Sequence, residues 1–209
     1  MKPKSIASLR AKSSLQVLRA SAILFASALS ASAADFTWDG GGGDNKATTA
    51  GNWAADITPT GGAKTYEWNA TSAIGTAIDW DFSAGTNPNS FTFAAGSPAY
   101  SFTGNNIQFI GAVTSLANNS SNVQTIANNI QVFFNSTKTF DANTAGLALG
   151  SVGFRGDSLV SGNTNTLNLT GAFNGTISGA MNEVVMPSGA KSALTKNGTG
   201  TWTLSGVNT

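Results

Sequence analysis

Side chains that could do chemistry are scarce in this chain. Its 209 residues include no His and no Cys, and only ten Asp and Glu. These absences exclude Ser-His-Asp triads, thiolate nucleophiles, disulfides and metal sites built on imidazole or sulfur. Only oxygen ligands remain for a metal, which restricts the choice to Ca²⁺ or Mg²⁺.

One close acidic pair, Asp79 and Asp81, has the spacing that places two carboxylates on one face of a strand. Hydrolysis of a glycosidic bond requires two carboxyl groups about 5 to 9.5 Å apart. No His and no second carboxylate cluster supports this pair, so a solvated strand face is the favoured interpretation and a catalytic dyad the alternative. We expect no enzymatic activity, no cofactor and no metal site.

A glycine run from Gly40 to Gly43, followed by Asp44 and Asn45, invites comparison with a Ca²⁺-binding nonapeptide. Asn45 stands where that motif requires Asp, and the run does not recur, whereas such sites need stacked copies. No Gly-Lys-Ser/Thr sequence closes the run, so it is not a phosphate-binding loop. The segment is predicted to be a flexible loop.

Four of the five Trp residues gather near the start of the chain. If their faces are exposed, they could stack on sugar rings and bind cell-surface glycans. If they are buried, they form the core or cap of a small N-terminal module, which is the favoured interpretation because Trp dominates burial. The four residues are Trp38, Trp53, Trp68 and Trp80.

The N-terminal segment predicts export. Five basic side chains and no acidic one precede an apolar run at residues 20–29. Ala31 and Ala33 then form an A-x-A pattern, which predicts signal cleavage immediately before Ala34 and disfavours a mitochondrial presequence. Ten apolar residues are too few to span a bilayer, and no later segment is more apolar. We expect an exported protein, extracellular or associated with a bacterial cell surface or outer membrane.

After cleavage the chain would be mildly acidic, with six basic and ten acidic side chains. A single Arg, Arg155, and no basic cluster argue against a nucleic-acid partner. About half of residues 34–209 are Gly, Thr, Asn or Ser. Apolar residues nevertheless recur in period-2 bursts bounded by Gly and Asn, which predicts short strands, and no convincing helix follows the signal peptide. The bursts are Phe91–Phe93, Tyr100–Phe102, Ile107–Phe109, Leu147–Leu149, Leu167–Leu169 and Trp202–Leu204.

The bursts also repeat along the chain. The sequence Asn-Asn-Ile-Gln at 105–108 returns at 128–131, an offset of 23 residues, and Leu147–Leu149 is echoed by Leu167–Leu169 at an offset of 20. Periods of 20 to 25 residues with several strands each predict the coils of a β-solenoid, with Asn or Thr ladders at the bends. An antiparallel sandwich or barrel is the alternative.

The segment 193–209 resembles the autotransporter-associated β-strand repeat. That family reads Leu-Thr-Lys-x-Gly-x-Gly-Thr-Leu-Thr-Leu-Ser-Gly-x-Asn-Thr, and here Trp202 replaces the usual Leu. More loosely, Trp38-Asp39-Gly40 with Asn52-Trp53 resembles the start of large secreted proteins built from these repeats. The matching residues are Leu194, Thr195, Lys196, Gly198, Gly200, Thr201, Thr203, Leu204, Ser205, Gly206, Asn208 and Thr209.

This resemblance implies a right-handed parallel β-helix that serves as a passenger or stalk of an autotransporter-like adhesin. The expected organisation is a signal peptide at 1–33, a Trp-rich cap with the first strands at 34–90, and solenoid coils at 91–209 that end within a repeat. The chain is therefore expected to be an N-terminal fragment. Its expected partners are cell-surface glycans or other cells, and copies of itself through uncapped solenoid ends.

Overall fold

Alternating apolar side chains, interrupted every few residues by Gly or Asn, give this chain short strands and tight corners. The computed structural model describes residues 34–69, 75–83, 86–110, 114–133, 137–156 and 164–208. These residues form 17 β-strands and one short 3₁₀ helix, η1 (Ala50–Asn52). The predicted signal peptide lies outside the described residues, so it stays a prediction.

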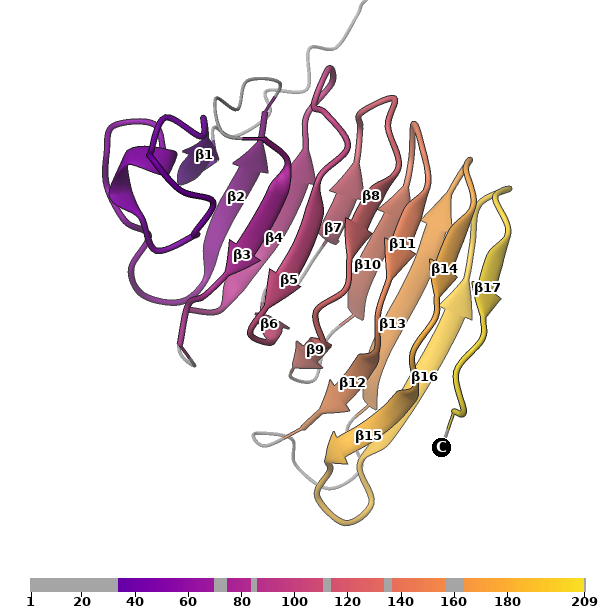
Figure 1. The fold of residues 1–209 in the computed structure, drawn as a ribbon. Coiled ribbons are helices and arrows are strands. Elements are labelled where there is room, and N and C mark those ends of the chain that lie inside the picture. Colours follow the sequence, from indigo (N-terminus) through magenta and orange to yellow (C-terminus); the bar gives the residue numbers. More distant parts are fainter. Residues whose placement is uncertain are drawn as a thin grey trace, which may run out of the picture. The chain divides into compact units, whose positions relative to one another are not determined.

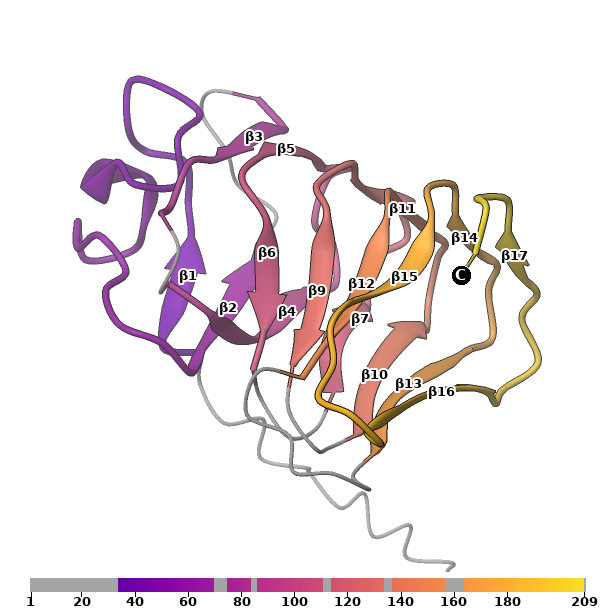
Figure 2. The ribbon, with the colours of Figure 1, turned by 90° about the horizontal axis from the view of Figure 1, so that it is seen from below.

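The strands assemble into three sheets (Figures 1 and 2). The seven-stranded sheet contains, in spatial order, β1 (Phe36–Trp38), β2 (Lys64–Trp68), β4 (Pro88–Phe93), β7 (Thr114–Asn118), β10 (Thr137–Ala142), β13 (Thr164–Gly171) and β16 (Lys191–Lys196). The six-stranded sheet contains β3 (Ala77–Trp80), β5 (Ser101–Gly104), β8 (Gln124–Ile126), β11 (Leu147–Leu149), β14 (Gly175–Ile177) and β17 (Trp202–Leu204). The four-stranded sheet contains β6 (Ile107–Phe109), β9 (Ile130–Phe133), β12 (Val152–Arg155) and β15 (Met181–Val185).

The chain visits the three sheets in turn, and each circuit is one coil. From β4 onward every group of three strands, such as β4, β5 and β6, contributes one strand to each sheet. Every pairing between these strands is parallel. The fold is therefore a β-solenoid of about five turns, as predicted, and the sandwich alternative is wrong. The right-handedness implied by the resemblance stays a prediction.

The register confirms one sequence repeat and corrects another. Ile107 pairs with Ile130, as the offset of 23 predicts. Leu147–Leu149 pairs instead with Gly175–Ile177 of the same sheet, whereas Leu167–Leu169 belongs to the seven-stranded sheet. The offset of 20 therefore linked strands of different sheets, because any strand with one buried face produces a Leu-x-Leu pattern.

Amide side chains link successive coils. Gln108 Nε2 donates to Gln131 Oε1 at 2.9 Å, and Asn128 Nδ2 donates to the carbonyl of Asn105 at 2.7 Å. Asn143 Nδ2 donates to Asn119 Oδ1 in the preceding coil at 2.9 Å. Of these bonds, the one between Asn143 and Asn119 joins Asn side chains of successive coils just after β10 and β7, which is the kind of contact that the predicted ladders require.

Inward side chains form columns that run through the stack of coils. One column in the six-stranded sheet places a large apolar residue at each level, and all its members except the last are buried. Each level packs on the next, so the columns make one continuous core. The members of this column are Ile78, Phe102, Ile126, Leu149, Ile177 and Leu204.

Candidate functional site

The four early Trp residues lie inside the first coils. Trp38, Trp53 and Trp68 have no exposed surface, and Trp80 is 1% exposed. Trp38 and Trp53 pack edge to face with ring centroids 5.1 Å apart, and Trp53 lies 5.4 Å from Trp68. Such packing fits the predicted cap, and it leaves none of these four rings available for stacking on a sugar.

The Trp-Asp-Gly and Asn-Trp segments meet at this end of the solenoid. Trp38 and Trp53 form an antiparallel bridge, and the backbone N–H groups of Asp39 and Gly40 both donate to the Asn52 carbonyl at 3.1 Å. Trp53 Nε1 donates to the Ala47 carbonyl at 2.8 Å. We call this end, formed by β1, β2, β3 and residues 39–63, the head. The two motifs are therefore joined by hydrogen bonds that close the head. We call such a group of hydrogen bonds between two segments a clasp.

The glycine run belongs to that clasp and is not the flexible loop that its composition predicted. Asn52 is fully buried, its Oδ1 accepts the Gly42 N–H at 2.9 Å, and its Nδ2 donates to the Lys46 carbonyl at 2.9 Å. The Asp44 carboxylate accepts the Lys46 N–H and the Thr49 hydroxyl. These hydrogen bonds, the Lys46 N–H foremost, lower the pKa of Asp44. Sequence reasoning missed Asn52, although its place beside Trp53 was a signal.

The acidic pair fastens the same loop to β3. Strand β3 ends at Trp80, so Asp81 follows the strand instead of lying on it with Asp79. The Asp81 carboxylate accepts the N–H of Thr48 at 2.9 Å and its hydroxyl at 2.6 Å. The backbone of Asp79 pairs with the segment around Lys46. Both residues therefore serve the closure of the head.

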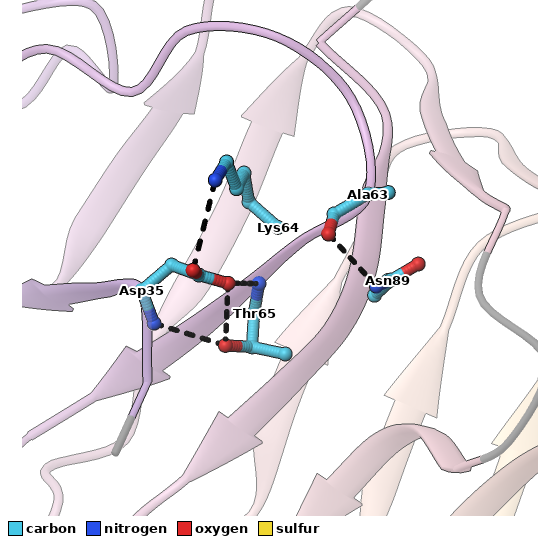
Figure 3. Close-up of polar contacts among 5 residues, drawn as sticks. All are labelled: Asp35, Ala63, Lys64, Thr65 and Asn89. Atoms are coloured by element: carbon cyan, nitrogen blue, oxygen red, sulfur yellow. Dashed lines mark hydrogen bonds and ion pairs between the residues drawn. The ribbon is translucent and has the colours of Figure 1, made fainter. Parts of the chain in front are cut away.

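A second clasp holds the segment just after the predicted cleavage site (Figure 3). Asp35 Oδ2 accepts the Thr65 N–H at 2.8 Å and the Thr65 hydroxyl at 2.9 Å, and Lys64 Nζ lies 3.7 Å from Asp35 Oδ1. The hydrogen bond from the Thr65 backbone is the main reason that the pKa of Asp35 is lowered. Nearby, Asn89 Nδ2 donates to the Ala63 carbonyl at 2.8 Å and ties β4 to the same corner. Of the predicted cleavage residues, only Ala34 is described, and it is half-buried beside this clasp.

The segment that resembles the family repeat forms β16, a corner and β17. Gly198 has a φ of +76°, a conformation that favours glycine, and Cβ atoms at Gly200 and Gly206 would overlap the backbone of the preceding coil. Asn208 Oδ1 accepts the Met181 N–H at 2.9 Å. The remaining described matches lie in or beside the two strands: Leu194, Thr195 and Lys196 in β16, Thr201 before β17, Thr203 and Leu204 in β17, and Ser205 after it. Thr209 lies outside the described residues. The glycine spacing of the motif is therefore a consequence of close coil stacking.

One buried charge was missed by the sequence analysis. Lys138 has no exposed surface and lies on the inward face of β10 with Phe140 and Ala142. Burial lowers its pKa from 10.5 to about 8. The alternation of Lys138 with Phe140 was a sufficient signal, because both must face the same side of a strand.

No protein-family model matches the chain, and neither the curated proteins nor the solved structures provide a match. Within the described ranges, no group of three or more acidic side chains is placed to hold a metal ion. In the same part of the chain, no helix has the length and apolar character needed to cross a membrane.

Proposed function

We propose that this chain is a non-enzymatic structural protein of the bacterial cell surface, the passenger or stalk of an autotransporter-like adhesin. The observation that supports this best is the last described coil. The family-like motif supplies the two strands of this coil, β16 and β17. Between them it supplies glycines where the backbone of the preceding coil leaves no room for a Cβ. The motif is thus used as a repeat unit of a solenoid.

The way the coils are joined suits such a role. Successive coils from β4 to β15 are joined by three parallel ladders, and the first and last described coils are joined to them by two, so the stack needs no disulfide outside the cell. The outward row of the six-stranded sheet carries mostly small and hydroxyl side chains, which gives a regular, mildly polar face. That row consists of Ala77, Ser101, Thr125, Ala148, Thr176 and Thr203. Other cells or surface glycans would meet the protein on faces of this kind.

Export is the first part of the proposal to test. The tagged full chain is expressed in a Gram-negative host, and the product is sequenced from its N-terminus. We expect a product that begins at Ala34, processing that fails in Ala33→Leu, and normal processing in the matched Ser32→Ala variant. An unprocessed cytoplasmic product with the wild-type sequence would contradict export.

The surface role is tested on intact cells of the source bacterium with an antibody against residues 34–209. We expect labelling without permeabilisation, and loss of that labelling after external protease treatment. Labelling only of permeabilised cells would contradict a surface role. Hydrolysis of a glycan that disappears in a double variant, Asp79→Asn with Asp81→Asn, would instead assign an enzyme.

A further inference from the structure

A hollow of about 380 Å³ lies where the four-stranded sheet begins. Its described lining residues are Phe82, Gly104, Asn105, Asn106 and Gln108. Phe82 follows β3, and the other four residues belong to the end of β5, the corner after it and β6. The six-stranded sheet starts with β3, whereas the four-stranded sheet starts one coil later with β6. The hollow therefore lies on the head side of the solenoid, where the chain enters its first coil of three strands.

Hydrogen bonds hold the walls of this hollow in place. Asn105 Nδ2 donates to the Phe82 carbonyl at 3.0 Å, and the Asn105 carbonyl accepts Asn128 Nδ2 from the next coil at 2.7 Å. Gly104 has a φ of +101°, and a Cβ there would lie 2.7 Å from the Trp80 carbonyl oxygen. The lining is therefore preformed, which lowers the cost of ordering it around a ligand.

The amide of Gln108 is fixed in orientation. Arg155 Nη1 donates to Gln131 Oε1 at 3.2 Å, and because a guanidinium can only donate, Gln131 must present its oxygen here. The same oxygen accepts Gln108 Nε2 at 2.9 Å, which turns Gln108 Oε1 away from Gln131. No described residue donates a hydrogen bond to Gln108 Oε1. Gln108 therefore brings a fixed acceptor to the hollow.

Asn106 brings a second amide. Its side chain is exposed and makes no hydrogen bond to any described residue. At the equivalent position of the next coil, Asn129 Oδ1 accepts the Ser151 hydroxyl at 3.2 Å. An amide group both donates and accepts, as a hydroxyl group also does. Asn106 and Gln108 together can therefore bind two neighbouring hydroxyl groups of one ligand.

We propose that this hollow binds one neutral sugar ring, the end residue of a glycan. Two neighbouring hydroxyls bond to Gln108 Oε1 and to the Asn106 amide, and Phe82 meets the C–H groups of the ring. No Lys or Arg is among the described lining residues, and a Cβ at Gly104 would lie 2.5 Å from Asp79 Oδ1, so a carboxylate borders the hollow and disfavours an acidic sugar. Its volume of about 380 Å³ lies within the usual range of ligand pockets, about 300 to 1,000 Å³.

The site would give the proposed adhesive protein a glycan to bind, and in that sense it rests on the proposed function. Binding is measured on purified protein, so failed export and failed binding are separate results. The probes are the methyl glycosides of glucose, galactose and mannose, added to the isotope-labelled full chain and followed by two-dimensional NMR. We expect the side-chain NH₂ signals of Asn106 and Gln108 to shift with at least one probe, with a dissociation constant of about 1 to 10 mM.

A substitution within the hollow tests which groups bind. Asn106→Ala should weaken binding about fivefold, because one hydrogen bond to the sugar is lost. The matched control, Asn143→Ala, removes an exposed amide that bonds to Asn119 outside the hollow, and it should bind the sugar as the wild type does. Both positions are exposed, so the fold is preserved, and the backbone NMR spectrum verifies this.

Three results would overturn the proposal. The first is the absence of shifts with all three neutral glycosides at about 100 mM, well above the expected dissociation constant. The second is equal binding by Asn106→Ala and the wild type, or shifts confined to residues outside the hollow. The third is tighter binding of methyl glucuronide, an acidic sugar, than of methyl glucoside.

Discussion

The head and the last described coils, formed by β15, β16 and β17 and called the tail, are built from equivalent strands, but the described residues cover only the head. At the head, Trp53 and the loop around Asn52 cover the edge of β1, and Asp81 fastens the same loop to β3. At the tail, β16 and β17 end in open edges, and Leu204 is exposed in a column whose other members are buried. The head is therefore closed by its own loop, whereas no described residue covers the outer edges of β16 and β17.

The largest expected difference between the ends is in how much the free energy of unfolding falls when a core side chain is truncated to Ala. Trp68 contacts Trp38, Trp53 and four further rings, so Trp68→Ala should lower the free energy of unfolding by about 3 to 5 kcal/mol. Leu204→Ala should cost less than about 1 kcal/mol, because its side chain is already partly exposed. The matched control in the same column, Ile177→Ala, should cost about 2 to 5 kcal/mol.

Urea unfolding monitored by circular dichroism measures all three variants. Similar losses for Leu204→Ala and Ile177→Ala would show that the tail is covered in solution, and they would break the contrast between the two ends.

The next effect concerns two lysines on inward positions of the seven-stranded sheet. Lys138 is buried and its pKa is lowered to about 8, whereas Lys196 at the tail is exposed and donates to the Gly198 carbonyl. Between pH 8 and 10.5 the unfolded chain holds more protons than the folded chain, so stability should rise with pH.

From pH 8 to 9.5 the expected gain in the free energy of unfolding is about 2 kcal/mol. The measurement stops at pH 9.5 because burial raises the pKa of Tyr100 to about 12. Above pH 10 the Tyr100 hydroxyl therefore keeps its proton in the folded chain and loses it in the unfolded chain, so stability falls as the pH rises. Lys138→Met should remove the rise, and Lys196→Met should keep it. A pH-independent stability of the wild-type chain would contradict the burial of Lys138.

A smaller effect tests how Trp202 of the tail packs on the preceding coil. The Trp202 ring occupies the space over Gly175, where a Cβ would lie 2.5 Å from ring atoms, and Trp202 Nε1 donates to the Thr170 carbonyl at 3.1 Å. Gly175→Ala should cost about 1 to 2 kcal/mol, because the partly exposed ring can shift. In the background of Trp202→Ala the same substitution should be nearly neutral. Additive losses in a double-mutant cycle would contradict this interlock.

The smallest effect separates two tyrosines near the head. Tyr100 donates its hydroxyl to the Asn69 carbonyl at 2.6 Å, whereas the buried Tyr66 hydroxyl has no hydrogen-bond partner among the described residues. Tyr100→Phe should therefore cost about 1 kcal/mol, and Tyr66→Phe should be neutral or slightly stabilising. Thermal unfolding of the two variants checks the sign, and a clear loss for Tyr66→Phe would contradict the buried, unpaired hydroxyl.

Much of the architecture could be predicted from the sequence, because period-2 apolar bursts identify strands wherever one face is buried. The burst Phe91–Phe93 lies in β4, and Leu167–Leu169 lies in β13. The offset of 23 identified residues that pair in the sheet, because it compared a four-residue sequence, Asn-Asn-Ile-Gln, that contains three amide side chains. The offset of 20 failed because Leu-x-Leu carries no information on which sheet a strand joins.

The chemistry of individual side chains was harder to predict. Composition alone cannot tell whether a Trp ring faces a sugar or a core, since both uses favour large aromatic surfaces. In the structure Trp38 and Trp68 are paired across β1 and β2, and neither has exposed surface. The glycine run at 40–43 suggested flexibility because its hydrogen-bond partner, Asn52, lies further along the chain. The only sequence signal for this contact was the place of Asn52 beside Trp53, outside the glycine run itself.

Residue-resolved hydrogen exchange tests the contrast between a closed head and an open tail most directly. In the 209-residue chain, amides of β2, β4 and β5 should be protected with the free energy of global unfolding. Amides of β16 and β17 should exchange orders of magnitude faster, because each of these strands has only one partner strand among the described residues. Equal protection of β4 and β16 would contradict the contrast between a closed head and an uncovered tail.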